Sequence, residues 1–375
     1  MKQLSIITLL LALFCVPSLS AQTPARRASL PAAAPHYGDA IEQGREVVAK
    51  LMAARGLPGF SIAVARDGVV IWSEGFGLAD VEQGVRVTPL TRFRLGSVSK
   101  VLTAAGVVKL VEEGKLDLDA PIQRYVPGFP AKPWPVTTRQ LANHGAGIRH
   151  YLPKDFEGPL KGAPHFDSVK KALTIFQDDA LLFQPGTSYS YSSYGWNLVS
   201  AVVEGASGED FLAYMQRAIF EPLGLRGVSA DHVDAVIPNR TRFYARTSSG
   251  ALQHAPHVDN SYKWAGGGFI ATAEDLVRLA SAELQPGFFK KEALDVLFAP
   301  SNKMPDGKTG VAVAWRIGTD SQGRRIFHHG GSIEGGRSML MAYPDSKVVV
   351  AMLTNMGTDF GEQDAQKIGA LFVGK

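Results

Sequence analysis

Two serine–lysine pairs with the same three-residue spacing stand out in the sequence, Ser97 with Lys100 and Ser168 with Lys171. A serine hydroxyl is a weak nucleophile until a nearby base takes its proton. Residues three apart on a helix share a face, so either lysine could reach its serine. The same pattern also fits a helix N-cap followed by a solvated lysine. The spacing therefore predicts acyl-transfer chemistry without selecting the nucleophile.

A tyrosine segment favours Ser97 as the nucleophile. Tyr191 lies between a Pro-Gly turn and an apolar stretch typical of a helix. A tyrosine held near the Lys100 ammonium could have a lowered pKa and act as a base. Tyr189 and Tyr194 are nearby competitors, and a buried ring in an aromatic-rich turn is the structural alternative.

A glycine-rich segment near the C-terminus also favours Ser97. His329, Gly330, Gly331 and Ser332 end a predicted strand. Glycines let a substrate lie against a strand backbone. The backbone N–H of Ser332, paired with that of Ser97, could form an oxyanion hole. The alternative is a glycine bulge with exposed histidines.

The elements that must position these residues follow from hydrophobic periodicity. We expect a helix over 39–55 that stops at Gly56, and a hairpin of strands 60–65 and 69–72 with Asp67-Gly68 as its turn. Further segments are predicted by the same criteria: helices over 98–113, 194–206, 209–220, 273–283 and 362–372, and strands over 311–317, 325–328, 338–343 and 348–354.

Strands at both ends with helices between them predict an α+β fold. It would be one antiparallel sheet built from both termini, with flanking helices and an inserted, mostly helical lobe. The expected boundaries are 39–115 with 310–375 for the α/β lobe, and 116–309 for the helical lobe.

The N-terminus has the pattern of a secretion signal. Lys2 gives a positive start, residues 6–16 are an apolar run too short for a reliable membrane span, and residues 18–21 are small. We expect a signal peptide over 1–21, a flexible leader over 22–38, and export to a bacterial periplasm or secretion. Cys15, the one cysteine, would leave with the signal, so the mature protein would lack a disulfide and a thiol nucleophile.

Composition narrows the partners. The net charge is +4, without a Lys/Arg-rich run, so nucleic-acid binding is not expected. His254 and His257 lie three residues apart without a carboxylate cluster, so neither a metal nor another cofactor is predicted. The partner should be a small-molecule or peptide substrate, and nothing indicates an oligomeric state.

Together these motifs resemble the serine β-lactamase and penicillin-binding-protein family. The order Ser97, Tyr191, His329 is similar to the branch with class C β-lactamases, esterases and D-amino-acid peptidases, and residues 141–148 resemble one of its segments. Residues 147–151 and 258–269 are most similar to the mitochondrial serine β-lactamase-like proteins and their bacterial relatives.

The resemblance runs from about Ile41 to the C-terminus and implies a β-lactamase/transpeptidase-like fold. It implies an acyl-enzyme at Ser97, with Lys100 and Tyr191 as the base, acting on amide (peptide) or ester bonds. The substrate would lie against Ser193 and residues 329–331. A β-lactamase or D-Ala-type cell-wall peptidase remains an alternative within this chemistry. A catalytically silent scaffold should have a broken Ser–Lys–Tyr set, and here all three residues are present.

Two departures from the family pattern bear on the substrate. Ser193 stands where the family usually has asparagine, and His329 stands where class C enzymes have lysine. An unperturbed histidine is mostly neutral at pH 7. We therefore expect weak capture of the β-lactam carboxylate and a preference for peptides or simple esters.

Overall fold

The structure is a computed structural model that describes residues 37–358 and 360–374. The predicted signal peptide, and the leader up to residue 36, lie outside the described residues. Helix α1 (Gly38–Arg55) begins one residue earlier than expected, and Gly56, in a left-handed conformation, stops it as predicted.

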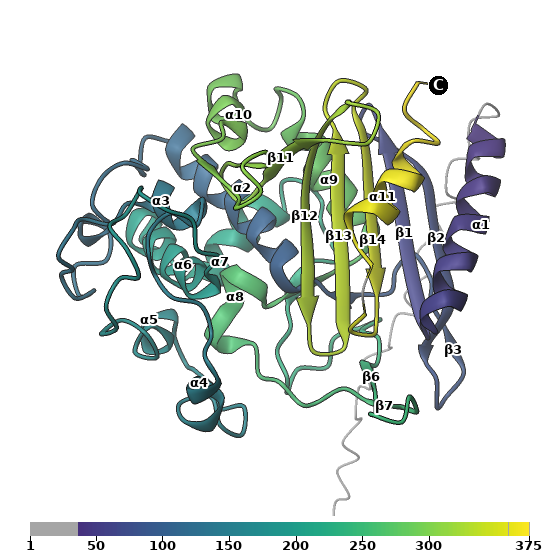
Figure 1. The fold of residues 1–375 in the computed structure, drawn as a ribbon, viewed down its shortest axis with the longest axis horizontal. Coiled ribbons are helices and arrows are strands. Elements are labelled where there is room, and N and C mark those ends of the chain that lie inside the picture. The colour runs from purple at the N-terminus through teal and green to yellow at the C-terminus, as the bar shows by residue number, and fades with distance from the viewer. Residues whose placement is uncertain (1–36, 359, 375) are drawn as a thin grey trace, which may run out of the picture. The chain divides into compact units, whose positions relative to one another are not determined.

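One antiparallel sheet of nine strands organises the described residues, in the order β3-β2-β1-β14-β13-β12-β11-β10-β9. Its first three strands come from the N-terminal part and the rest from the C-terminal part, as predicted (Figure 1). The strands are β1 Gly59–Arg66, β2 Val69–Asp80, β3 Val85–Arg86, β9 Asn302–Lys303, β10 Gly310–Val311, β11 Arg316–Thr319, β12 Arg325–Ile333, β13 Gly336–Tyr343 and β14 Val348–Thr354.

The central strands are buried on both faces because side chains alternate between two cores. In β14, Val348, Val350 and Met352 face the core shared with α1 and α11 (Glu362–Gly369). The alternate residues, such as Val349 and Ala351, face the core that contains α9 (Ala273–Glu283). The sheet is thus the middle layer between two layers of helices (Figure 1).

The remaining helices lie together on the β12 side of the sheet, away from α1 (Figure 1). They are α2 Ser99–Glu112, α3 Thr138–Ala142, α4 Pro153–Glu157, α5 Val169–Leu173, α6 Ser193–Ser207, α7 Phe211–Met215, α8 Trp264–Gly267 and α10 Lys291–Phe298. Short strands connect this region: β4 Phe93–Arg94, β8 Phe269–Ala271 and β5 Ser229–Ala230 in one sheet, and β6 Tyr244–Arg246 with β7 Leu252–His254 in another.

Several expected elements differ from the structure in their bounds: β2 runs on to Asp80, β12 runs on to Ile333, and α11 ends at Gly369. Two others are interrupted or shifted. The strand predicted over 311–317 is broken into β10 and β11, because Ala314 has a positive φ of 67° and the backbone turns there. The helix predicted over 209–220 starts at Phe211, where Asp210 caps it, and widens into a π-type turn over Gln216–Phe220. The predicted hairpin turn is confirmed, since Asp67 and Gly68 both have positive φ.

Candidate active site

Ser97 lies in a 3₁₀ turn, Gly96–Val98, that leads directly into α2. The turn packs against β12 at very short range. A Cβ added to Gly96, whose φ is +50°, would lie 2.7 Å from the Ser332 carbonyl oxygen, and one on Gly331 would lie 1.9 Å from that of Leu95. Both positions therefore require glycine, and this contact brings the backbones of Ser97 and Ser332 together.

Lys100 is fully buried on the first turn of α2. Its Nζ lies 3.1 Å from Ser97 Oγ, 3.2 Å from Ser193 Oγ and 2.6 Å from the Gly266 carbonyl oxygen. Among the described residues no carboxylate forms an ion pair with it. Burial, assisted by the positive charge of Arg316, lowers the pKa of Lys100 well below its usual value. Lys100 is thus suited to hold a neutral amine.

Tyr191 completes the cluster, because its hydroxyl donates a 2.7 Å hydrogen bond to Ser97 Oγ. The two competing tyrosines make other contacts: Tyr194 donates to Asp155, and Tyr189 packs edge-on against His144. Burial raises the pKa of Tyr191, which is opposite to the lowering expected from a nearby ammonium. The tyrosine is therefore a protonated partner of Ser97 rather than a standing base.

The tyrosine segment is held by the start of α6. Ser192 caps that helix by accepting a hydrogen bond from the Gly195 N–H, and its own hydroxyl donates to the Arg149 carbonyl. The Ser192 N–H donates to Nδ1 of His144, whose ring lies 4.3 Å from that of Tyr191. His144 therefore supports Tyr191.

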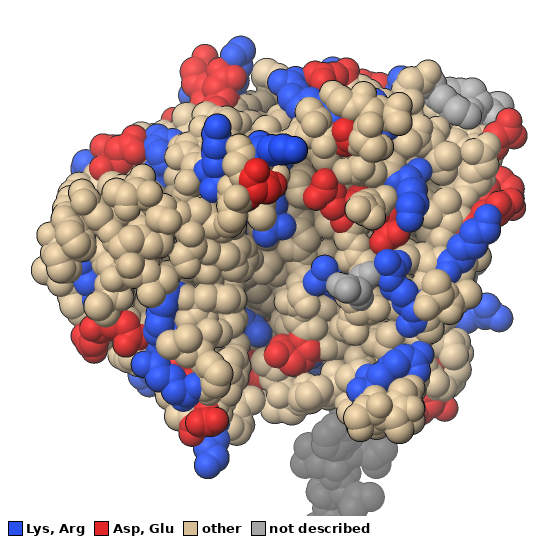
Figure 2. Space-filling view, in the orientation of Figure 1, with Lys and Arg blue, Asp and Glu red and all other residues tan. Residues whose placement is uncertain are grey.

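A cavity of about 580 Å³ opens over this cluster. Its lining includes most of the residues predicted for the site, namely Ser97, Tyr191, Ser193, Gly330, Gly331 and Ser332. The hollow is visible on the face drawn in Figure 2, with basic and acidic side chains around it and no single-sign patch. Ser193 contacts Lys100 as well as the cavity, so its hydroxyl is part of the nucleophile's surroundings.

His329 does not reach the cavity surface, contrary to the prediction. The side chain is 1% exposed, and its Nδ1–H donates to the Gly330 carbonyl oxygen. Burial and the charges of Arg316 and Lys100 lower the pKa of His329 well below its usual value. It is a neutral residue buried on the side of the strand that faces Lys100 and His144, and it is not part of the cavity lining, so direct substrate contact is not its role in this structure. The neighbouring His328 is the histidine that lines the cavity.

Sequence reasoning missed the charged residues of the cavity. Arg316 lies over the Tyr191 ring at 6.0 Å, and Lys263 lies 3.7 Å from Glu334. Burial lowers the pKa of Lys263 to about 8. Lys263 lies inside the segment 258–269 whose resemblance was noted, which was a usable signal. No motif in the sequence marked Arg316. Its guanidinium places a cation in the cavity, whereas His329 in place of a lysine had been expected to leave the cavity without one.

The second serine–lysine pair is not at the site. Ser168 is exposed and caps α5, accepting a hydrogen bond from the Lys171 N–H, while the Lys171 side chain pairs with Asp167. Within residues 37–358 and 360–374, no cluster of three or more histidine, aspartate or glutamate side chains could hold a metal ion. In the same residues no helix has both the length and the apolarity to cross a membrane.

Comparison with known proteins places this geometry in context. The chain is 33% identical to the mouse serine beta-lactamase-like protein LACTB, mitochondrial, over 87% of this chain and 76% of the relative. It is 27% identical to a D-aminopeptidase of Gluconobacter oxydans, over 80% of this chain and 56% of that protein. The octameric penicillin-binding protein homologue of Pyrococcus abyssi superposes with a TM-score of 0.80 at 26% identity, over 89% of this chain and 78% of that one.

The expected location needs correction. The apolar N-terminus predicted export to a bacterial periplasm or secretion. The mammalian relatives at 32–33% identity are named as mitochondrial proteins, which contradicts that prediction and points to mitochondria instead.

The β-lactamase family model matches residues 45–372, which include the sheet, the helical region and every residue of the cluster around Ser97. The antiparallel sheet with flanking helices is the fold of its penicillin-binding-protein relatives. The chain therefore belongs to the β-lactamase family.

Proposed function

We propose that this protein is a serine hydrolase that cleaves amide or ester bonds through an acyl-enzyme on Ser97. The observation that carries the proposal is the buried Lys100, which lies 3.1 Å from Ser97 Oγ and has no carboxylate partner among the described residues. A neutral amine has two protons and one lone pair. The protons suit the Gly266 carbonyl and Ser193 Oγ, and the lone pair is left for the Ser97 hydroxyl.

Acylation follows from this arrangement. The Lys100 amine takes the Ser97 proton while Oγ bonds to the substrate's carbonyl carbon, and the carbonyl electrons move to oxygen. Collapse of this intermediate re-forms the carbonyl and breaks the bond to the leaving group. The leaving group takes a proton from Tyr191, which regains one from the Lys100 ammonium. Water then cleaves the acyl-enzyme with the same groups as base and acid.

The backbone supports the developing oxyanion. Gly96 lies against the Ser332 backbone, and Ser97 and Ser332 both line the cavity, so we assign their backbone N–H groups as the oxyanion hole. Gly330 and Gly331 give the substrate a strand edge without side chains to lie against. A peptide or other amide is our first choice of substrate, supported by the D-aminopeptidase relative.

Arg316 favours a second candidate class, which is a substrate with a carboxylate near the scissile bond. Its guanidinium stays charged at any physiological pH. It lines the same cavity as Ser97 and could attract the carboxylate of a β-lactam or of a peptide ending in D-alanine.

The test is labelling with a fluorophosphonate, measured by intact mass. We expect one covalent adduct on the wild-type protein and none on Ser97→Ala. A silent scaffold would give no adduct on either protein, and an adduct that persists on Ser97→Ala would contradict the assignment. A panel of a p-nitrophenyl ester, peptide anilides and nitrocefin then ranks the substrate classes.

A further inference from the structure

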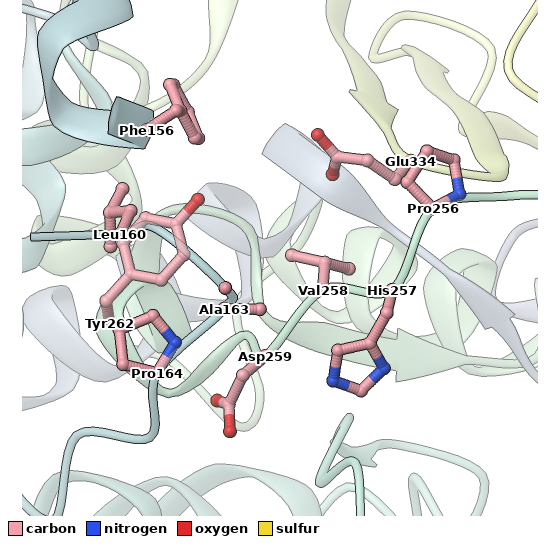
Figure 3. Close-up of a pocket in the computed structure, with 11 residues that line it drawn as sticks. Phe156, Leu160, Ala163, Pro164, Pro256, His257, Val258, Asp259, Tyr262 and Glu334 are labelled. Carbon is pink, nitrogen blue, oxygen red and sulfur yellow. The ribbon is translucent and has the colours of Figure 1, made fainter. Parts of the chain in front are cut away.

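A second cavity, of about 410 Å³, adjoins the catalytic one (Figure 3). The two share three lining residues, Phe156, Tyr262 and Glu334, so these side chains form the threshold between them. We call the second cavity the annex. Because the two cavities share these residues, a group attached to a substrate bound at Ser97 could extend into the annex.

The annex is apolar. Its walls include Leu160, Pro164, Pro256 and Val258, and Phe156 stands at its edge with 47% of its surface exposed. In Figure 3 the side chains of Phe156, Leu160, Tyr262 and Val258 surround the open space. An exposed aromatic ring beside buried aliphatic side chains is typical of a ligand-binding surface, because a bound apolar group removes that surface from water.

The polar groups that face the annex lie at its threshold, where Figure 3 shows the Tyr262 hydroxyl and the Glu334 carboxylate directed toward the open space. The Asp259 carboxylate contacts His165 Nδ1 at 2.9 Å and accepts the Ser261 N–H at 2.7 Å. Figure 3 shows Asp259 and His257 pointing away from the space between Phe156 and Val258. Glu334, at the threshold, pairs with Lys263. Beyond the threshold, what the annex offers a ligand is therefore mainly apolar surface.

The annex is also held open by its own contacts. The His165–Asp259 pair and a 2.8 Å hydrogen bond from the Phe166 N–H to Ser261 Oγ join the loop before α5 to the segment before α8. Asn197 on α6 donates to the Tyr262 carbonyl at 2.5 Å. A cavity formed in advance costs a ligand little ordering of the protein.

The proposed chemistry decides which part of the substrate lies there. Tyr191 must donate a proton to the leaving group, so the leaving group departs on the side of Tyr191 and Arg316. The carbonyl oxygen is directed to the N–H groups of Ser97 and Ser332. The acyl substituent takes the remaining direction, past Ser332 toward Glu334 and the annex.

We infer that the annex binds an apolar acyl group, so that the enzyme prefers amides and esters with an aliphatic or aromatic residue on the acyl side. This inference rests on the proposed function of Ser97. Each methylene group that enters the annex should raise kcat/KM about fourfold, the gain expected from burying a CH₂ group. The gain should stop when the annex is full.

The experiment measures kcat/KM for p-nitrophenyl esters from acetyl to octanoyl with variants of Val258, which lines the annex and not the catalytic cavity. For the wild type we expect hexanoyl to exceed acetyl at least about tenfold. Val258→Phe fills the annex and should remove most of that advantage, while acetyl turnover stays within about twofold because acetyl does not reach Val258. Val236→Phe, at a side chain 97% exposed, is the matched control and should change neither.

Phe156→Ala provides a second variant at an exposed position, in case Val258→Phe folds poorly, and it too should lower the hexanoyl advantage. A second series keeps the acetyl group and lengthens the leaving alcohol. It should show no dependence on Val258, and a dependence there would overturn the assignment to the acyl side. Equal kcat/KM for acetyl and hexanoyl esters would overturn the annex while leaving Ser97 catalysis intact. Loss of all Ser97-dependent turnover would instead contradict the proposed function itself.

Discussion

The two serine–lysine pairs have the same spacing and opposite surroundings. Ser97 and Lys100 lie where the helical region meets β12, and Lys100 is fully buried. Ser168 and Lys171 lie on the surface, where the Lys171 side chain is 64% exposed and paired with Asp167. The spacing brings both lysines near their serines, but only burial without a counter-charge makes a lysine a base near neutral pH.

Residues distant in the sequence complete the catalytic motif. Lys100 meets Gly266 from α8 and Ser193 from α6, and Ser97 meets Tyr191. Hydrogen bonds from these segments offset part of the cost of burying an amine. The hydrogen bond of the Ser168 hydroxyl is to a residue of its own helix, Lys171, so the hydroxyl serves as a cap.

The largest expected difference between the two pairs is in turnover. Ser97→Ala should lower kcat by about 10⁴-fold or more, because the nucleophile is lost. Ser168→Ala should leave kcat unchanged. Steady-state hydrolysis of a p-nitrophenyl ester measures both, and equal losses in the two variants would remove the distinction.

The lysines should differ next. Lys100→Met keeps the buried volume and removes the base, so kcat should fall at least about 10²-fold, as for other general bases. Lys171→Met should have no effect on kcat. Circular dichroism melting checks that both variants fold, and near-normal activity of a folded Lys100→Met would contradict the role of the amine.

Tyr191→Phe tests whether Tyr191 and Lys100 act as one catalytic unit. Alone it should also cost about 10²-fold in kcat, since the leaving group loses its proton donor. Combined with Lys100→Met it should cost little more than either change, because residues that act as a unit are not additive. Multiplying losses would mean that the two side chains act separately.

The pH profile tests the charge state of Lys100. Activity needs the neutral amine, so kcat/KM should rise with pH through the lysine's pKa and then level off. Arg316 helps to lower that pKa. Arg316→Gln should therefore raise the pKa and move the acid limb to higher pH, while Arg325→Gln, at an exposed arginine paired with Asp345, should not. If the acid limb does not move in Arg316→Gln, Arg316 does not lower the pKa of the catalytic base.

The smallest expected effect is on stability, where the two serines should exchange roles. Ser168→Ala removes an N-cap and should lower the free energy of unfolding by about 1 kcal/mol. Ser97→Ala removes no cap, so its effect on that free energy should be smaller. Urea unfolding of both variants measures the difference, and a larger loss for Ser97→Ala would show that its hydroxyl stabilises the fold.

Much of the fold could be predicted because short sequence patterns specify its turns and the ends of its helices. The stop at Gly56 and the Asp67-Gly68 turn both need positive φ, and the sequence has the residues that allow it. Ala314 also has positive φ, but alanine gives no sign of that, so the break between β10 and β11 was missed. The predicted division into two lobes stays a prediction.

The sequence motifs predicted the catalytic cluster. They could not predict which residues of neighbouring strands lie beside it. Arg316 pairs with His328 across β11 and β12, a register that the sequence does not reveal. His329 follows His328 on the strand, so its side chain points to the opposite face of the sheet. Both side chains are buried, and His328 is the one that is part of the cavity lining. A resemblance to a lysine position could not show which of two adjacent histidines reaches the cavity.

The most direct test is to locate the acyl group that a substrate leaves on the protein. The wild-type enzyme is quenched in acid during turnover of a p-nitrophenyl ester, digested, and analysed by tandem mass spectrometry. The account predicts the acyl mass on Ser97 and on no other serine. An acyl group on Ser168, or rapid turnover without any acyl-enzyme, would contradict it.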